Sequence, residues 1–323
     1  MAEGLRRRGV HVEIVELAGS FPDPSSDDLR DAAIAMSRLS DDSLVVVDGL
    51  ALGAMPHVVE REANRLRLVP LVHLPLGADV SREPTAAARL REQERRALLA
   101  TRRIVVTSHA TVPMLEPYGL AADSIQVVEP GTDPAPLARG SQDGRVHLLC
   151  VATVNAGKGH EILFRALAQV STREWRLTCA GSLTRDPAAA DRAHQTIERL
   201  GLREWVDLRG ELDTRAVEDC YDRADVFVLA TLQETYGMAV AEALAHGLPV
   251  VSTATGAIPS LVGSAAGIVV PAGDTDALAG ALANVIGDAG LRAQLSESAR
   301  EVRERLPTWE DACETFAAAL SEV

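Results

Sequence analysis

The chain has 323 residues, of which 47% are hydrophobic and 24% charged, and its formal net charge is −14. This length favours two domains, and the acidic balance argues against nucleic acid as the main partner. No apolar run reaches the roughly 18 residues that a bilayer-spanning helix needs, and no leader with a cleavage site is recognisable, so we predict a cytoplasmic protein.

The first nine residues, "MAEGLRRRG", are typical of the last turns of a helix that ends at a glycine. An α/β domain of this type normally opens with a strand and a tight loop before such a helix. We therefore expect the first strand and its loop to be absent from this sequence. The alternative is that the helix simply leads the fold.

Short β-branched apolar runs then alternate with helical patterns along the whole chain, which predicts parallel sheets covered on both faces. The predicted strands cover residues 10–17, 43–49, 68–76, 103–108, 124–131, 146–154, 176–183, 205–212, 226–231, 248–255 and 266–274. The main predicted helices cover residues 160–170, 187–200, 214–222, 237–246 and 275–287.

Arginines crowd the segment between residues 89 and 103, which could suit an anionic lipid surface. Glu92 and Glu94 are interleaved with them, and this favours a solvated, salt-bridged helix face. The sequence therefore permits peripheral membrane contact but gives no evidence for it.

The segment 133–144, "DPAPLARGSQDG", is rich in Pro, Gly and small polar residues and is predicted to be the hinge. We expect two doubly wound Rossmann-like domains, over residues 1–136 and 137–305. A final helix in residues 306–323 is expected to return to the first domain. Its buried face would comprise Trp309, Ala312, Cys313, Phe316, Ala319 and Leu320, which recur at helical spacing.

Lys158 is the only lysine of the chain, and it lies between Gly157 and Gly159 where a predicted strand gives way to a helix. The glycines let backbone approach a ligand closely, and a helix start offers unpaired N–H groups that suit phosphate. A compact ammonium fits a narrower slot than a planar guanidinium. The motif differs from a Walker A loop in its spacing; alone, a Gly-Lys-Gly turn is also common on protein surfaces.

A second strand end, in "ADVFVLATLQETYGMAVAEALAHGLPVV", places Glu234 before a predicted helix and Glu242 inside it. Carboxylates accept hydrogen bonds from paired hydroxyls, which ribose and hexose share. The N–H groups near Gly237 and Met238 again suit phosphate. The alternative without function is that Glu242 caps the helix or pairs with a neighbouring arginine, and that Glu234 is merely solvated.

This stretch resembles the nucleotide-sugar signature of family 4 retaining glycosyltransferases, which have the GT-B fold. The family pattern is Glu, seven residues, Glu, with a Gly after the first and "EA…G.PVV" after the second. "LLCVATVNAGKGHEILFRALA", "CAGS", "VVEPGTD" and "AGIVVPAGDTDALAGAL" match further family segments in order. The resemblance covers residues 100–310 well and the first hundred residues loosely.

The resemblance implies roles for individual residues. Glu242 matches the glutamate that binds the ribose hydroxyls, Glu234 the one beside the donor sugar, and Lys158 the lysine that neutralises the donor diphosphate. His73, in "LVHLPL", matches a histidine close to donor and acceptor; its alternative is a satisfied histidine within an apolar strand. The expected donor-binding positions are completed by Gly157, Gly159, Thr153, Gly181, Leu212, Gly237 and Met238. Ser108 and Glu94 resemble positions that organise the cleft.

The sequence also departs from the family. Many relatives have an arginine five or six residues before the lysine, where this chain has Thr153 and Ala152, and Arg185 is a conceivable substitute. The first-strand glycine loop of the family has no counterpart. A phosphate clamp with one charge fewer stabilises the transition state less. We therefore expect slow catalysis if no other cation takes the place of this arginine.

No metal or cofactor is expected. "DTD" at residues 274–276 resembles the Asp-X-Asp of another glycosyltransferase fold, yet it directly precedes a helix, so we predict a helix cap at Asp274. The cysteines have neither metal-ligand spacing nor the density of a disulfide scaffold, which predicts reduced, buried thiols; they are Cys150, Cys179, Cys220 and Cys313.

The sequence thus predicts a metal-independent hexosyltransferase that uses a nucleotide-diphosphate sugar with retention, acting on a small-molecule, glycan or lipid-linked acceptor. Two alternatives remain. One is a catalytically impaired module that only binds nucleotide sugar, and the other is a GT-B nucleotide-sugar epimerase.

Overall fold

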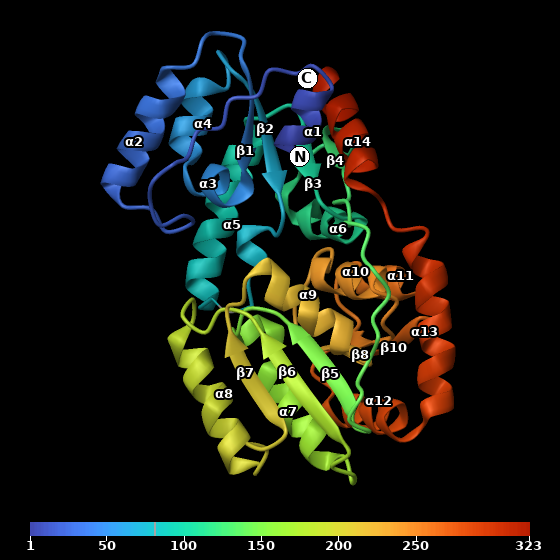
Figure 1. Ribbon diagram of the computed structural model, residues 1–323. Helices are drawn as coiled ribbons and strands as arrows, with labels where there is room; N and C mark the ends of the chain where they lie inside the picture. Colours follow the sequence, from blue (N-terminus) through green and yellow to red (C-terminus); the bar gives the residue numbers. More distant parts are fainter. Residues whose placement is uncertain (81) are drawn as a thin grey trace. The chain divides into compact units, whose positions relative to one another are not determined.

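A computed structural model describes residues 1–80 and 82–323 of the chain. The chain divides into two compact units (Figure 1). Unit 1 contains Met1–Gly131 and Pro307–Val323, and unit 2 contains Thr132–Leu306. The boundaries expected from the sequence were residues 136 and 305.

Unit 1 is built on a four-stranded parallel sheet in the order β1-β2-β3-β4. Its strands are β1 (Leu44–Asp48), β2 (Arg67–Val72), β3 (Ile104–Val106) and β4 (Ile125–Val127). Its α-helices are α1 (Ala2–Arg7), α2 (Ser26–Ser37), α3 (Gly49–Ala54), α4 (Pro56–Glu62), α5 (Pro84–Leu99), α6 (Val112–Leu115) and α14 (Trp309–Ser321). Its described residues also form the 3-10 turns η1 (Leu76–Ala78), η2 (His109–Thr111), η3 (Glu116–Tyr118) and η4 (Ala122–Ser124).

The predicted strand over residues 10–17 is wrong, because this segment is irregular in the structure. A strand needs a hydrogen-bonded neighbour, and β1, the nearest strand along the chain, pairs with β2. Some apolar side chains of this segment pack against buried clusters, and others are exposed to solvent. Val12 and Leu17 pack against buried clusters, whereas Ile14 is 62% exposed.

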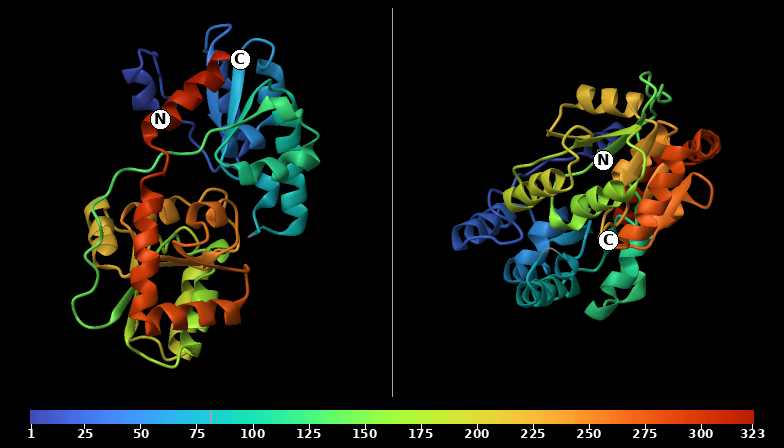
Figure 2. Two further views of the ribbon diagram at one scale, coloured as in Figure 1. Left: turned by 90° about the vertical axis from the view of Figure 1, so that its right-hand side faces the viewer. Right: turned by 90° about the horizontal axis from the view of Figure 1, so that it is seen from below.

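The returning helix α14 belongs to unit 1 and lies beside α1 (Figure 1, Figure 2). Gly131 lies so close to Trp309 that an added Cβ would come within 2.2 Å of the Trp309 backbone nitrogen. Of the predicted inner face, four residues are buried and two, Trp309 and Leu320, are half-buried; the buried ones are Ala312, Cys313, Phe316 and Ala319.

The arginine-rich segment lies largely on α5, and its ion pairs confirm a salt-bridged helix face. Arg95 pairs with Glu92 at 3.6 Å and Arg96 with Glu60 at 2.8 Å. The expectation that Glu94 lies on this exposed face is wrong, because Glu94 is fully buried. The pattern placed it among arginines, but the 3.6-residue period turns its side chain inward.

Unit 2 has a six-stranded parallel sheet in the order β10-β9-β8-β5-β6-β7. Its strands are β5 (Val146–Val151), β6 (Trp175–Ala180), β7 (Val206–Gly210), β8 (Val226–Leu229), β9 (Val250–Thr253) and β10 (Gly267–Val270). Its helices are η5 (Ala156–Lys158), α7 (His160–Gln169), α8 (Pro187–Arg199), α9 (Thr214–Arg223), α10 (Met238–Ala245), α11 (Ile258–Val262), α12 (Thr275–Gly287) and α13 (Ala289–Arg303).

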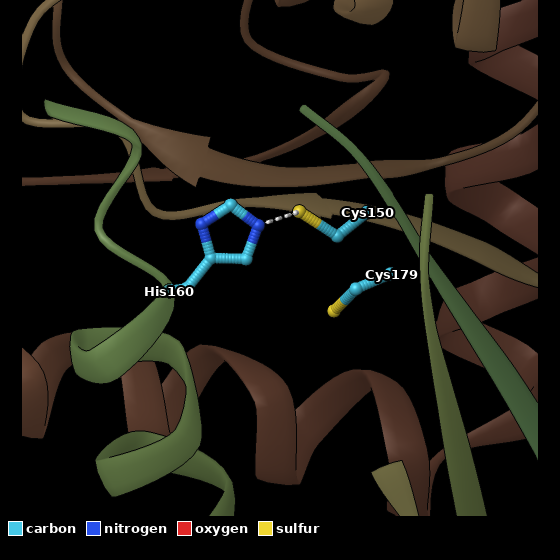
Figure 3. Close-up of side chains that lie close together, drawn as sticks. All are labelled: Cys150, His160 and Cys179. Atoms are coloured by element: carbon cyan, nitrogen blue, oxygen red, sulfur yellow. Dashed lines mark hydrogen bonds between the residues drawn. The ribbon is translucent and has the colours of Figure 1, made fainter. Parts of the chain in front are cut away.

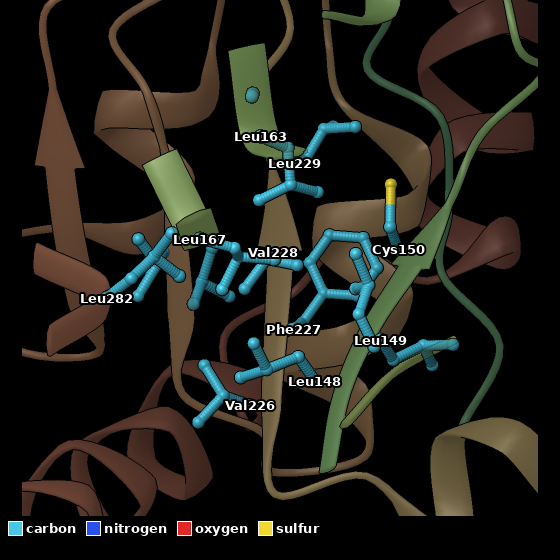
Figure 4. Close-up of a cluster of buried hydrophobic side chains, with 14 of the residues drawn as sticks. Leu148, Leu149, Cys150, Leu163, Leu167, Val226, Phe227, Val228, Leu229 and Leu282 are labelled. Carbon is cyan, nitrogen blue, oxygen red and sulfur yellow. The ribbon is translucent and has the colours of Figure 1, made fainter. Parts of the chain in front are cut away.

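Helices cover both faces of this sheet (Figure 1): α7, α8 and α12 pack side by side on one face, while α9 and α10 lie on the other. The central strands are apolar along their whole length because both of their faces are buried. Figure 4 shows part of this core, in which Val226–Leu229 of β8 and Leu148 and Leu149 of β5 belong to one buried cluster with Leu163 and Leu167 of α7 and Leu282 of α12.

The hinge predicted over residues 133–144 is irregular chain, but most of it is fastened to unit 2. The backbone N–H of Ala138 donates to the carbonyl of His246, and those of Arg139 and Gly140 donate to the carbonyl of Asp222. Asp225 then accepts from the Ser141 N–H at 3.1 Å. The connection is held to unit 2 from Ala135 onward, because the Ala135 carbonyl accepts from the Arg303 guanidinium at 2.7 Å.

Candidate active site

The Lys158 loop follows β5 and is shaped by its own side chains and glycines. Asn155 caps the turn η5, with its side-chain oxygen accepting from the Lys158 N–H at 3.0 Å. Gly159 then adopts a left-handed conformation, φ +66°, and α7 begins. A Cβ at Gly159 would lie 2.0 Å from the carbonyl oxygen of Ala230, so only glycine lets this loop approach the end of β8.

The loop after β8 is tied to the Lys158 loop by hydrogen bonds. The carbonyl of Gly157 accepts from the Leu232 N–H at 2.7 Å and from the Thr231 hydroxyl at 3.1 Å. Between the side chains, Nζ of Lys158 donates to Oε2 of Glu234 at 2.6 Å. The Lys158 and Glu234 side chains are 26% and 17% exposed, so the pair is shielded from bulk solvent yet still accessible to a ligand.

This ion pair spans the point where the strand order of unit 2 reverses. From β5 the chain proceeds to β6 and β7 on one side, whereas β8, β9 and β10 follow on the other. In open α/β sheets, ligands bind outside the carboxyl ends of the strands at such a switch point. Lys158 follows β5 and Glu234 follows β8, the two strands that adjoin at the reversal.

Glu242 lies in α10, which begins after Gly237 in a left-handed conformation, φ +99°. The Tyr221 hydroxyl donates to Oε2 of Glu242 at 2.9 Å. Burial raises the pKa of the Glu242 carboxyl above its ordinary value; the Tyr221 bond opposes that shift, and the negative charges of Glu218 and Asp133 add to it. A half-buried carboxylate with one donor has room to accept from further hydroxyls.

Tyr221 is itself held firmly, so it fixes the position of Glu242. Its ring stacks on that of His246, with centroids 4.7 Å apart and planes at 10°. His246 is 2% exposed; its Nδ1 lies 3.0 Å from the Pro136 carbonyl, and its Nε2 lies 3.3 Å from Glu218. Sequence reasoning missed Tyr221 and His246, whose only signal was that two polar aromatic residues occupy otherwise helical patterns.

The remaining predicted donor-binding positions lie at strand ends of unit 2. Gly181 follows β6 with φ +154°, and a Cβ there would lie 2.0 Å from the Ala152 carbonyl oxygen. Thr153 is half-buried in the loop after β5, Leu212 is half-buried after β7, and Met238 opens α10. Arg185, the conceivable second cation, is exposed in the loop between β6 and α8.

His73 lies in unit 1, directly after β2, and its ring nitrogen Nε2 is 3.6 Å from Oδ2 of Asp48 at the end of β1. Its side chain is 55% exposed, which excludes the alternative of a satisfied histidine within an apolar strand. Ser108, which follows β3, is buried and caps η2 by accepting from the Ala110 N–H. Both residues thus lie at carboxyl ends of the unit 1 sheet.

Glu94 anchors the segment that follows His73. Its Oε2 accepts from the Leu76 N–H at 2.8 Å and from the Tyr118 hydroxyl at 2.6 Å. Burial raises the pKa of Glu94 to about 7, while the hydrogen bonds from Tyr118, Leu76 and Gly77 oppose the rise. Below about pH 7 this carboxyl is mostly protonated, and it then packs without an unpaired charge.

Asp274 is a helix cap, as predicted, because its side chain accepts from the Ala277 N–H at the start of α12. No helix among the described residues is long and apolar enough to cross a membrane.

Part of the chain is similar to known proteins. The family model for glycosyl transferases group 1 matches residues 145–288. Residues 145–288 belong to the group 1 glycosyltransferase family. The D-inositol 3-phosphate glycosyltransferase of Xylanimonas cellulosilytica is 30% identical over 281 residues, which cover 79% of this chain and 66% of that protein. The chain thus spans just under two thirds of that relative, and 51% of the corresponding protein of Corynebacterium aurimucosum.

Solved structures confirm the GT-B fold. Sucrose-phosphate synthase from Thermosynechococcus elongatus aligns with a TM-score of 0.80 at 21% identity, over 92% of this chain and 78% of that one. The Anabaena protein HepE in complex with UDP and glucose aligns with a TM-score of 0.76 at 19% identity, over 92% of this chain and 82% of that one. The residues matched by the family model, 145–288, all lie within unit 2 and include Lys158 and Glu234.

Proposed function

We propose that this chain is a retaining glycosyltransferase that transfers a hexosyl group from a nucleotide-diphosphate sugar without a catalytic metal. The observation that carries the proposal is the Lys158–Glu234 pair at the switch point of a group 1 glycosyltransferase domain. The donor would occupy the carboxyl ends of β5 and β8. HepE, which has the same fold, is a protein solved with UDP and glucose, so UDP-sugars are the first donors to test.

Lys158 would stabilise the charge that develops on the leaving diphosphate. An ammonium has three donors, so it can keep its bond to Glu234 while it donates to a phosphate oxygen. The N–H groups at the start of α10 would add their partial positive charge. Charge accumulates on the leaving phosphate as the glycosidic bond breaks, and groups placed there beforehand lower the barrier.

The two glutamates would have separate tasks. Glu242, held by Tyr221, would accept hydrogen bonds from the ribose hydroxyls, which supply the donors that a half-buried carboxylate lacks. Glu234 would orient the sugar ring and stabilise the positive charge that develops on it. Its pairing with Lys158 holds the carboxylate in place before the donor arrives.

Retention would follow from a front-face displacement. The bond between the anomeric carbon and the phosphate oxygen breaks, the acceptor oxygen bonds to the same face, and the acceptor proton passes to the leaving phosphate. The products are then the glycoside and a nucleoside diphosphate. His73 would assist near the acceptor hydroxyl, because imidazole donates or accepts a proton near neutral pH.

Two measurements test the proposal. A thermal-shift panel of nucleoside diphosphates identifies the base, since a ligand bound only by the folded state raises Tm. Transfer assays with the matching nucleotide sugar, with and without EDTA, followed by NMR of the anomeric proton, then determine the stereochemistry. We expect a shift with at least one diphosphate and EDTA-insensitive transfer with retention; inversion, or transfer that EDTA abolishes and Mg²⁺ or Mn²⁺ restores, would contradict the mechanism.

The same assays separate the two alternatives. A module that only binds nucleotide sugar would show the thermal shift but no turnover. The same would hold for a version of the chain that is extended upstream. An epimerase would convert a single nucleotide sugar into its epimer in the absence of an acceptor.

A further inference from the structure

Three side chains from β5, β6 and α7 meet beneath the Lys158 loop (Figure 3). Cys150, the penultimate residue of β5, lies next to Cys179 of β6, with which it is in register, and His160 is the first residue of α7. Nε2 of His160 lies 3.8 Å from Sγ of Cys150, and the three potential ligand atoms all lie within 4.8 Å of one another.

This cluster is deeply buried and poorly satisfied by hydrogen bonds. Cys150, Cys179 and His160 are 1%, 2% and 3% exposed. Nδ1 of His160 has no hydrogen-bond partner among the described residues, and Nε2 faces only a thiol, which is a weak partner. Buried polar groups normally have good hydrogen-bond partners. The His160 imidazole therefore lacks the partners expected of a buried ring.

Two thiols and an imidazole are the ligand types that thiophilic metal ions select. Zn–S and Zn–N bonds of about 2.3 and 2.0–2.1 Å place tetrahedral ligand atoms about 3.5–3.8 Å apart. The Sγ–Nε2 separation already has that size.

We propose that Cys150, Cys179 and His160 bind a zinc ion inside unit 2. Three protein ligands leave one position of a tetrahedral ion for a further ligand. The ion would join β5, β6 and the first turn of α7, and so would hold both ends of the segment 151–159. Because that segment carries Lys158, the site would stiffen the donor loop from below without taking part in group transfer.

The test measures metal in the intact chain. Protein purified under reducing conditions from zinc-supplemented medium should contain about one zinc per chain, by elemental analysis after gel filtration. Growth in cobalt-supplemented medium should give the intense near-ultraviolet absorption of a thiolate–cobalt bond. Zinc content near zero, together with no such band, overturns the proposal.

Variants locate the ion. Cys150→Ala, Cys179→Ala and His160→Gln should each lose the metal, whereas Cys220→Ala and Cys313→Ala, which remove buried cysteines elsewhere, should keep it. Equal metal in all five variants means an adventitious ion and overturns the proposal. Variants that fail to fold are replaced by release of zinc from the wild-type chain with a thiol-blocking mercurial, followed colorimetrically. A mass two hydrogens lower in the freshly purified chain, with a peptide map that links Cys150 to Cys179, would also overturn it.

Discussion

Nζ of Lys158 and Oε2 of Glu234 are 2.6 Å apart, although the two residues lie 76 positions apart in the sequence. The contact joins the loops after β5 and β8, which backbone hydrogen bonds from Leu232 and the hydroxyl of Thr231 to Gly157 already hold together. A cation and a carboxylate are thus fixed at the switch point in advance of any ligand. The cost of ordering them is met during folding, and the proposed site is preorganised for a charged donor.

Replacing Lys158 should impair turnover more than binding. We expect Lys158→Ala to lower kcat by about 10²–10³-fold, as removal of one preorganised donor does, with a change in nucleotide Kd below about 10-fold. Steady-state kinetics and calorimetry measure the two effects. Arg185→Ala, on the neighbouring loop, serves as the control; an equal loss there would transfer the role of phosphate cation to Arg185.

Removal of the Glu242 carboxylate should weaken donor binding. Hydrogen bonds to charged groups contribute about 1.5–3 kcal/mol each, so Glu242→Ala should raise the Kd for the nucleotide sugar by about 10–100-fold in calorimetry. Tyr221→Phe removes the hydroxyl that positions Glu242 and should have a smaller effect in the same direction. Wild-type affinity in Glu242→Ala would remove Glu242 from the site.

The glycine at 159 should be irreplaceable. In Gly159→Ala the new Cβ would lie 2.0 Å from the Ala230 carbonyl oxygen at φ +66°. Gly201 offers a matched control, because its φ is +65° and nothing lies within 4 Å of the position that an added methyl group would take. Gly201→Ala should therefore show only the left-handed penalty of about 1–2 kcal/mol. Thermal and urea unfolding should find Gly159→Ala clearly less stable than Gly201→Ala. An equal loss of stability in the two variants would show that the Lys158 loop can move away from the end of β8 without a cost in free energy.

Glu94 should make stability fall as pH rises. Its pKa is raised from 4.5 to about 7 by burial, so the folded chain keeps a proton that the unfolded chain releases from about pH 4.5 upward. The contribution is complete below pH 4.5 and is lost up to about pH 7, a change of about 3 kcal/mol at most. Urea unfolding of the wild type and Glu94→Gln across this range isolates it, since the amide does not titrate. Parallel pH profiles would contradict the assignment.

Asp274 should contribute to stability and not to metal binding. Asp274→Ala removes the cap of α12 and should cost about 1 kcal/mol in urea unfolding. Asp276→Ala, which keeps the cap, is the matched control in the same helix. Transfer by Asp274→Ala should respond to Mg²⁺ or Mn²⁺ no differently from transfer by the wild type.

Local pattern determined most elements of this protein. The runs around β5, β6 and β8 are apolar and β-branched between turn residues, and the structure has strands there, each shorter by a few residues than predicted. The caps at Asn155 and Asp274 are likewise local, because each side chain bonds an N–H three residues later. The strand expected at residues 10–17 failed for a non-local reason: its apolar, β-branched composition suits a strand, but a strand also requires a hydrogen-bonded partner.

The sequence by itself determined which residues follow strand ends, and this is why Lys158, Glu234 and Glu242 could be selected. It did not determine which strands are neighbours. Only the tertiary structure decided that β5 adjoins β8 and β6, and so paired Lys158 with Glu234, Glu242 with Tyr221, and Cys150 with Cys179 and His160. Element type follows from short-range periodicity, whereas strand order depends on long-range hydrogen bonding and packing of the whole sheet.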